Sequence, residues 1–216
     1  MINTVLIIDA SASKTLVAYC DRTRAVAVRE WTAGFKLSKE LLPAIEKVLV
    51  RRAKPTAIFC VTGPGSYTGL RIAVSTANAL GFAWGIPVIS IEAFEIYEVA
   101  SEKPGLSYTV VLDNIKDLVY VKRVKKRKAR YAVEKVTEMA IRNSKNKNQK
   151  IFGHIPEVKQ KTAGIKNKSF PADPLPGRRR AVLISRIGLK RLKKVRVFTE
   201  PLRPLYINAP HVTSKK

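Results

Sequence analysis

The stretch that decides the fold is TGPGSYTGLRI, residues 62–72, which joins an apolar run to a long helical pattern. Before it, Ala57–Val61 has the continuous apolar character of a buried parallel strand. After it, Ser66–Trp84 predicts a helix that Gly85 and then Pro87 would end. A glycine-rich turn between a buried strand and a helix is typical of α/β folds, and free N–H groups at the helix start favour an anion.

This stretch admits more than one interpretation. Its glycine spacing resembles a dinucleotide-binding loop, with Glu92 after the next strand as a ribose ligand, but Pro64 and Tyr67 crowd the turn. A P-loop is excluded, because Gly69 is followed by Leu70-Arg71 and not by Lys and Ser or Thr. A strand-to-helix turn that binds no ligand is the third interpretation.

The residues before the turn predict an antiparallel meander followed by a crossover. Thr4–Asp9, Thr15–Cys20 and Ala25–Trp31 are short strands with tight connections. Apolar residues at helical spacing then predict a helix around Leu41–Leu49, with Ser38 as its N-cap. After the long helix, the sequence predicts a strand at Val88–Ile91 and a short helix at Glu92–Ala100.

The second half repeats this order more loosely. Tyr108–Asp113 is an apolar strand that ends in Asp, and Leu118–Val124 and Arg130–Val136 alternate as strands do. Pro104-Gly105 marks the expected boundary between two subdomains. We therefore predict an N-terminal unit at 1–103 and a C-terminal unit at 104–216. Within the latter, 142–176 is expected to be a polar insertion of loops, and Arg178–Lys194 a helix with a basic face.

The charge of the chain is concentrated in that second half. Lysines and arginines number 41 against 16 acidic residues, a net charge of +25. Residues 1–100 carry 11 basic and 8 acidic groups, whereas residues 101–216 carry 30 and 8. Such a cationic half predicts a polyanionic partner, although a solvated surface or a general compositional bias would look the same.

Composition also limits class and compartment. A hydrophobic content of 46% indicates a globular chain and excludes a wholly disordered one. Cys20 and Cys60 lie in apolar runs, as buried thiols in a reducing cytoplasm do. The uncharged run Ile72–Ile91 is interrupted by Gly85-Ile86-Pro87, so we expect a soluble helix and strand there and no membrane span.

Ten of these residues, GPGSYTGLRI at 63–72, closely resemble the signature of the bacterial TsaB family, also called YeaZ. The resemblance extends to LIIDAS at 6–11, SKELLP at 38–43, PVIS at 87–90 and PLY at 204–206, and covers roughly residues 1–125. It implies an α/β fold of the actin/Hsp70-like (ASKHA) type, made of two RNase H-like subdomains that are each a mixed sheet with helices. That order matches the strands and helices expected from the residues alone.

The resemblance also implies a role and partners. TsaB proteins are non-catalytic subunits that pair with a TsaD-like transferase in the threonylcarbamoyladenosine modification of tRNA. A TsaE-like ATPase is a further candidate partner, and the chain alone is a candidate for weak homodimerisation. The helices around Leu41–Leu49 and Ser66–Trp84 would form the docking face. Its expected residues are Leu41, Leu42, Ile45, Leu49, Ala73, Thr76, Ala77 and Leu80. The signature loop contributes Gly63, Pro64, Gly65, Ser66, Tyr67, Thr68, Gly69 and Arg71.

Because the family substrate is tRNA, the basic half supplies candidate phosphate contacts. These are Lys125, Lys126, Arg127, Arg178, Arg179, Arg180, Lys193 and Lys194. Two further hypotheses stay open: a free-standing ATP-dependent enzyme of the same fold, and a basic RNA-binding module without a TsaD-like partner.

We expect no catalytic residue, metal or cofactor in this chain. Catalytic TsaD relatives carry an H-x-x-x-H metal pair, whereas His154 and His211 lie in unlike segments. Asp9 and Asp113 end corresponding strands, and in an actin-like cleft they would face each other across a magnesium nucleotide. Aspartate is also common in turns, so both residues are equally well explained as ordinary turn residues that bind no ligand.

Overall fold

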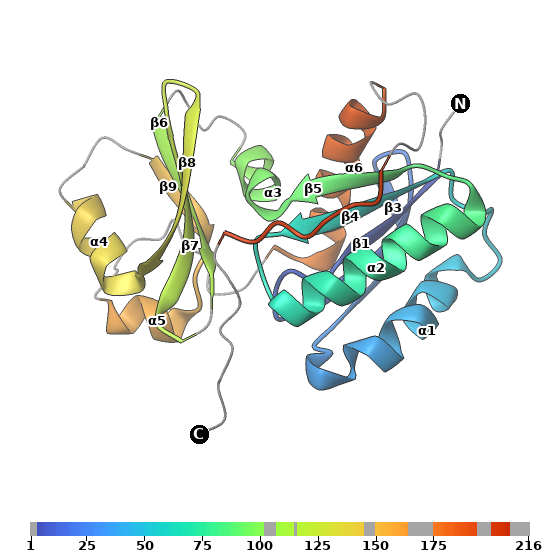
Figure 1. Cartoon of the computed structure of the whole chain (residues 1–216), viewed down its shortest axis with the longest axis horizontal. Helices are drawn as coiled ribbons and strands as arrows, with labels where there is room; N and C mark the ends of the chain where they lie inside the picture. Colours follow the sequence, from blue (N-terminus) through green and yellow to red (C-terminus); the bar gives the residue numbers. More distant parts are fainter. Residues whose placement is uncertain are drawn as a thin grey trace.

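The structure, a computed structural model, describes residues 4–101, 107–114, 116–144, 150–163, 175–193 and 200–207. The chain forms two lobes, each built on one mixed sheet (Figure 1). The first lobe holds the longer helices, and the second lobe holds a smaller sheet with two short helices. This is the predicted mixed α/β class with two sheets, and the prediction is confirmed.

The first lobe has a five-stranded sheet in the order β3-β2-β1-β4-β5. Its strands are β1 (Thr4–Asp9), β2 (Thr15–Asp21), β3 (Arg24–Trp31), β4 (Ala57–Gly63) and β5 (Val88–Glu92). The first three form an antiparallel meander, and β4 and β5 continue parallel to β1. Every residue of β4 is buried, because helices cover both faces of the sheet.

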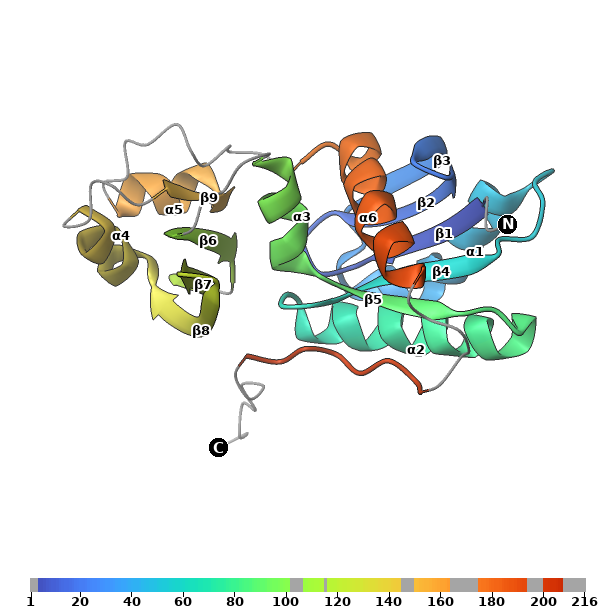
Figure 2. The ribbon, with the colours of Figure 1, turned by 90° about the horizontal axis from the view of Figure 1, so that it is seen from above.

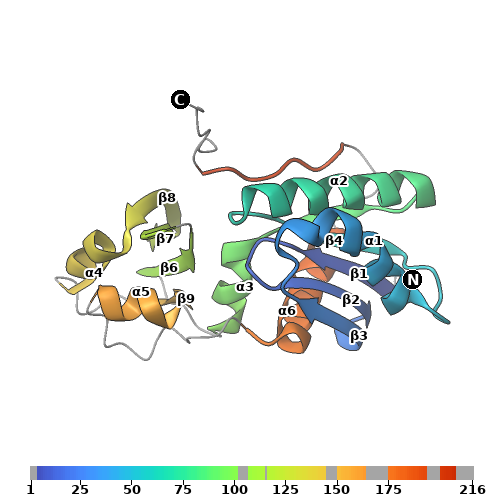
Figure 3. The same ribbon diagram turned by 90° about the horizontal axis from the view of Figure 1, so that it is seen from below.

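One face of this sheet packs α1 (Leu37–Leu49) and α2 (Tyr67–Trp84), with the 3-10 turn η1 (Gly34–Lys36) before α1. The other face packs α3 (Ala93–Ala100) and α6 (Gly177–Leu192). Figures 2 and 3 look from opposite sides and show α6 in front of the strands in one view and α1 in front in the other. The first lobe is therefore a three-layer α/β/α unit.

The second lobe has a four-stranded sheet in the order β8-β7-β6-β9. It comprises β6 (Ser107–Asp113), β7 (Leu118–Lys125), β8 (Lys128–Lys135) and β9 (Lys150–His154), with α4 (Val136–Ser144) and α5 (Glu157–Thr162). Buried valines of β6 and β7 pack on one face against Met139 of α4 and Ile155. The opposite face, including Val110, Leu112 and Tyr120, joins the core around α3 and α6.

Several expectations from the sequence need correction. The segment 142–176 was expected to be loops, yet its described part contains the end of α4, all of β9 and α5. Ser38 was expected as an N-cap, but α1 begins one residue earlier, and no side chain caps it. The contiguous division at residue 103 assigns α6 to the basic second unit, whereas α6 packs on the first sheet.

The run Ile72–Ile91 forms most of α2 and the start of β5, both packed inside the first lobe. Among the residues that the structure describes, no helix has the length and apolar character needed to cross a bilayer.

Helix α6 approaches the sheet closely at Gly188. A Cβ placed there would lie 2.4 Å from the Phe59 ring of β4, whose side chain is fully buried. The hydroxyl of Ser185, one turn earlier, donates to the backbone oxygen of Arg22. Glycine is therefore required at this contact by close packing, although it weakens a helix interior.

We expect Gly188→Ala to destabilise the protein by about 1–3 kcal/mol, because overpacking against Phe59 outweighs the gain in helix propensity. Urea unfolding would measure the change. Arg186→Ala, on the exposed side of the same helix, is the control and should change stability by less than about 0.5 kcal/mol. A stabilised Gly188→Ala variant would contradict the close contact.

Candidate functional site: the cleft between the lobes

A cavity of about 760 Å³ lies between the two lobes. Its lining comes from the β1–β2 turn, the start of α1, the signature loop with the start of α2, helices α3 and α6, strands of the second lobe and the C-terminal tail. Lining residues include Asp9, Ser11, Ser13, Gly65, Ser66, Tyr67, Thr68, Asp113, Asn114, His154, Arg180 and Tyr206. This volume is large enough for a small-molecule ligand.

The glycines of the signature loop are explained by packing of the chain on itself. A Cβ at Gly65 would lie 2.1 Å from the backbone oxygen of Ser11, which also accepts a hydrogen bond from the Ser66 amide at 2.8 Å. A Cβ at Gly63 would lie 2.7 Å from the backbone oxygen of Leu205, and Gly63 has φ of 127°. These glycines let the loop pack between the β1–β2 turn and the tail.

Ser66 is the N-cap of α2, and its hydroxyl accepts from the Gly69 amide at 3.2 Å. Tyr67 packs against Tyr206 of the tail, with ring centroids 4.7 Å apart and the rings tilted by 31°, and the guanidinium of Arg71 lies over Tyr67. Thr68 is exposed at the mouth of the cavity. The loop therefore holds the tail as well as starting the helix.

The described part of the tail, residues 200–207, runs along α2 (Figure 2). The Asn78 side chain holds Leu202 by two hydrogen bonds, since its amide donates to the Leu202 oxygen at 3.0 Å and its oxygen accepts from the Leu202 amide at 2.9 Å. The Leu205 amide donates to the Thr62 oxygen at 2.7 Å. Both ends of the chain thus build the first lobe.

Asp9 lies at the base of the cavity and is 1% exposed. Its carboxylate accepts from the Ser11 amide at 3.0 Å and from the Ser11 hydroxyl at 2.6 Å. The Nε atom of Arg180, from α6, lies 3.4 Å from the other carboxylate oxygen. The same guanidinium donates to Glu30 Oε1 at 3.0 Å and to the Lys14 backbone oxygen at 2.9 Å. A buried cation of the chain itself therefore neutralises Asp9.

Asp113, across the cleft, has a cationic partner of its own. The Lys159 ammonium of α5 lies 2.5 Å from Asp113 Oδ1 and also donates to the backbone oxygens of Asn114 and Leu118. A magnesium ion would be held by free carboxylate oxygens and would in turn bind the phosphates of the nucleotide. Both carboxylates that would serve in this way are already paired with a lysine or an arginine. Among the described residues, no group of three or more His, Cys, Asp or Glu is arranged to hold a metal ion.

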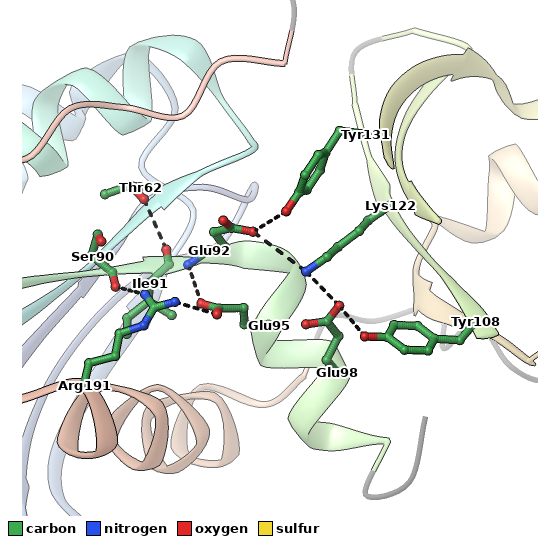
Figure 4. A network of polar contacts seen from close by, with 10 residues as sticks. All are labelled: Thr62, Ser90, Ile91, Glu92, Glu95, Glu98, Tyr108, Lys122, Tyr131 and Arg191. Atoms are coloured by element: carbon green, nitrogen blue, oxygen red, sulfur yellow. Dashed lines mark hydrogen bonds and ion pairs between the residues drawn. The ribbon is translucent and has the colours of Figure 1, made fainter. Parts of the chain in front are cut away.

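Helix α3 and its N-cap carry three glutamates at a spacing of three residues, and these form a polar network between the lobes (Figure 4). The Lys122 ammonium of β7 lies 2.8 Å from Glu98 and 3.9 Å from Glu92. The Tyr131 hydroxyl donates to Glu92 at 3.2 Å, and the Tyr108 hydroxyl donates to Glu98 at 3.0 Å. Three strands of the second lobe, β6, β7 and β8, are thereby tied to α3.

The middle glutamate of this set, Glu95, faces α6. Arg191 places its guanidinium 2.5 Å from Glu95 and also donates to the backbone oxygen of Ser90. The second oxygen of Glu95 accepts from the Glu92 amide at 3.0 Å and caps the helix. Burial is the main cause that raises the pKa of the Glu95 carboxyl. Helix α3 therefore links α6 on one side to the second lobe on the other.

The expected docking residues divide between the core and the surface, and four of them need correction. Leu41, Ile45, Ala73 and Ala77 are at most 2% exposed and pack under the sheet, so they cannot meet a partner. Leu42 is 50% exposed, and Leu49, Thr76 and Leu80 are half-buried at the outer surface. The helical apolar stripe that predicted the face is the stripe that faces the core.

The expected phosphate contacts divide in the same way. Arg180 is 2% exposed and belongs to the Asp9 pair, so its assignment to an RNA surface is wrong. Arg178 donates to the Ala25 backbone oxygen at 2.5 Å. The exposed candidates are Lys125, Lys126, Arg127, Arg178, Arg179 and Lys193. Lys194 lies outside the described residues, as does His211.

Comparison with known proteins identifies the family of this chain. Residues 33–190 match the family model described as TsaD, tRNA N6-adenosine threonylcarbamoyltransferase. The chain is 30% identical over 107 residues to the tRNA threonylcarbamoyladenosine biosynthesis protein TsaB of Haemophilus influenzae.

The chain belongs to this TsaD-type family.

The match to the Haemophilus TsaB covers 44% of this chain and 45% of that relative, so it spans less than half of the curated protein. YeaZ from Pseudomonas aeruginosa has the same fold, with a TM-score of 0.68 at 22% identity over 95% of this chain and 100% of that one. A second structure, an uncharacterized protein described as similar to peptidase YEAZ from Pseudomonas aeruginosa, gives a TM-score of 0.70 with the same identity and coverage.

Sequence reasoning missed Arg180, Lys159 and Lys122 as partners of carboxylates within the fold. A basic residue gives no local sign of whether it is paired inside the fold. The spacing of Glu92, Glu95 and Glu98 was visible, because residues three apart share one side of a helix.

Arg180→Met should destabilise the protein by about 3–5 kcal/mol, because it leaves Asp9 and Glu30 without their shared buried cation. Urea unfolding would measure the loss. Adding Asp9→Asn to this variant should restore part of it, since the uncompensated charge is then removed. A cost below about 1 kcal/mol for Arg180→Met would contradict the pairing.

The network around α3 predicts a loss of stability at alkaline pH. Burial alone would lower the pKa of Lys122, but the hydrogen bond and charge of Glu98 outweigh it and raise that pKa. Burial, and then the Glu98 charge, raise the pKa of Tyr108 to about 12. The folded state therefore holds both protons longer than the unfolded state, and stability falls as the pH rises above about 10.

Thermal unfolding between pH 8 and 12 tests this expectation. The wild type should lose stability more steeply above pH 10 than the double variant Lys122→Met with Tyr108→Phe. At pH 8, Lys122→Met alone should cost roughly 1–3 kcal/mol, because the partly buried Glu98 carboxylate loses its cationic partner and keeps the hydrogen bond from the Tyr108 hydroxyl. Parallel pH profiles for the two proteins would rule out this role of the network.

Proposed function

We propose that the chain is a non-catalytic subunit that pairs with a TsaD-like transferase in the threonylcarbamoyladenosine modification of tRNA. The observation that carries the proposal is the GPGSYTGLRI loop, which resembles the TsaB signature and starts α2 in a chain of the TsaD-type family. The name of the Haemophilus relative places that protein in the same biosynthesis.

The absence of catalysis by this chain alone is part of the proposal. Support comes from the cleft, where Arg180 pairs with Asp9 and Lys159 pairs with Asp113. A kinase-like enzyme of this fold would need both carboxylates for magnesium and would place an anionic nucleotide there. The internal pairs argue against that alternative, and no specific observation favours it.

The docking face that we propose is the outer side of α1 and α2, shifted from the stripe that periodicity suggested. Small exposed residues Ser75, Ala79 and Ala83 follow one another along α2 at a spacing of four. Phe82, at 82% exposed, and Leu42 add apolar surface nearby. Small residues let a partner helix approach closely, and an exposed aromatic side chain is a typical interface anchor.

The remaining partners belong to the same proposal. tRNA would be bound by the assembled complex, and a TsaE-like ATPase and a weak homodimer of this chain are further candidate assemblies. A cytoplasmic location follows from the substrate, and Cys20 and Cys60 are both buried free thiols, as a reducing compartment allows.

The proposal is tested by size-exclusion chromatography with light scattering on this chain mixed with the TsaD-like protein of the same source. A heterodimer at tens of micromolar would support it. Two separate peaks at that concentration would argue against it, because a stable interface of ordinary size survives such dilution.

Ala79→Arg should abolish the heterodimer and leave the monomer folded, because the new side chain lies on the outer face of α2. Ala77→Arg is the contrasting variant: its side chain would enter the core, so we expect unfolding of the monomer. Circular dichroism on each monomer separates loss of docking from loss of fold. A heterodimer retained by Ala79→Arg would show that another face is used.

A further inference from the structure

The turn between β7 and β8 places two basic residues at backbone positions that favour glycine or asparagine. Lys125 pairs directly with Lys128, so the strands are joined by the two-residue turn Lys126-Arg127. Both turn residues have positive φ angles, 48° and 69°. Two-residue hairpins of this kind prefer Asn-Gly, because other side chains are strained there. The chain thus keeps two cations in positions where uncharged residues would be more stable.

The strands next to this turn repel each other as well. Lys125 lies opposite Lys128, and Arg123 lies opposite Arg130. Like charges directly across a ladder destabilise the hairpin. The charge of Arg123 is paired with Glu134, whose carboxylate accepts hydrogen bonds from both terminal nitrogens of Arg123 at 2.6 and 2.7 Å. Lys122 of the same hairpin pairs with Glu98, whereas the five cations at its tip, Lys125, Lys126, Arg127, Lys128 and Arg130, form no salt bridge with any residue that the structure describes.

Other basic residues of the second half behave differently. Arg180, Arg191, Lys122 and Lys159 each reach a carboxylate inside the fold. Lysine or arginine also occupies the positive-φ positions 22, 51 and 116, so backbone strain alone does not set this turn apart. What sets it apart is the gathering of five exposed cations within residues 125–130, two of them directly opposed across the ladder. The unpaired charge at this turn therefore calls for an anion from outside the chain.

The position of the hairpin suits contact with a large partner. The turn lies at the end of the sheet where β6 begins, away from Asp113 and the cleft. Residues 125–130 are all exposed, and Figure 1 shows the hairpin projecting past α4 and α5. Because side chains alternate along a strand, Lys125, Lys128 and Arg130 lie on one face, with the two turn residues at its end.

We propose that this hairpin tip, formed by Lys125, Lys126, Arg127, Lys128 and Arg130, binds the sugar-phosphate backbone of RNA. Flexible lysines and arginines bind phosphates independently of sequence. Base stacking is not part of the contact, since the nearest aromatic hydroxyl, that of Tyr131, is turned toward Glu92 on α3. The choice of RNA over another polyanion rests on the proposed function, whose substrate is tRNA.

The turn geometry supplies a variant that removes charge without breaking the fold. Lys125→Gln, Lys126→Asn, Arg127→Gly and Lys128→Gln together place Asn-Gly in the turn, which this geometry prefers. The matched control removes four exposed cations at α1, through Lys36→Gln, Lys39→Gln, Lys47→Gln and Arg51→Asn. Both variants lower the net charge by the same amount.

The experiment measures binding of the isolated full chain to a fluorescein-labelled, unmodified tRNA transcript by anisotropy, between 50 and 300 mM KCl. The hairpin variant should lose at least about tenfold in affinity near 100 mM salt. Its slope of log affinity against log salt should become shallower by about 3, because each phosphate contact contributes roughly 0.7–0.9. The control should change affinity less than about threefold.

Equal losses in the two variants, no loss in the hairpin variant, or no measurable binding by the wild type would each overturn the inference. Competition by polyglutamate as effective as by duplex RNA would assign the tip to acidic polymers in general and would also overturn it. Thermal unfolding gives a second readout: at low salt the hairpin variant should melt higher than the wild type, because repulsion and turn strain are gone.

The same proteins separate this inference from the proposed function. The hairpin variant should still form the heterodimer with the TsaD-like protein, because the tip is remote from α1 and α2. Loss of RNA binding with an intact heterodimer supports both proposals. A wild-type chain that binds RNA through the tip but forms no heterodimer would remove the proposed pairing alone.

Discussion

The guanidinium of Arg180 holds the first lobe together at the point where three segments meet. It joins α6 to Asp9 at the end of β1, to Glu30 on β3 and to the backbone of the β1–β2 turn. A buried pair of this kind adds little net stability compared with an apolar contact, yet loss of one partner is costly. The pairing of Arg180 instead sets the position of α6, which lies late in the chain and is held on the first sheet. The base of the cleft also has its carboxylate neutralised without a metal.

The basic residues of the second half fall into two groups, those paired with carboxylates inside the fold and those left unpaired at the surface. Some cations form ion pairs inside the fold: Lys122 pairs with Glu98, Lys159 with Asp113 and Arg191 with Glu95. Others stand unpaired at the β7–β8 turn, on strained and mutually repelling positions. Net charge alone does not distinguish these groups, because each depends on whether a carboxylate from a distant segment lies within reach.

The signature loop connects this chain to its family through packing. Gly63 and Gly65 allow the loop to lie against the tail and the β1–β2 turn, and Tyr67 packs against the tail tyrosine. These contacts set the start of α2 and hence the direction in which its outer face is presented. A loop with the spacing of a phosphate site thus serves to position a helix surface.

The sequence by itself determined the meander, the two crossover strands, the limits of α2 and the family, because strand alternation, turn residues and a ten-residue signature are local properties. It did not determine which side of α2 is buried. Ala73 and Ala77 face the core while Ala79 and Ala83 face outward, and small residues on both sides give a weak periodic signal. The packing of α6 and the pairing of Arg180 were decided only by the tertiary structure. These contacts join residues about 150 positions apart, and no local pattern encodes such a distance.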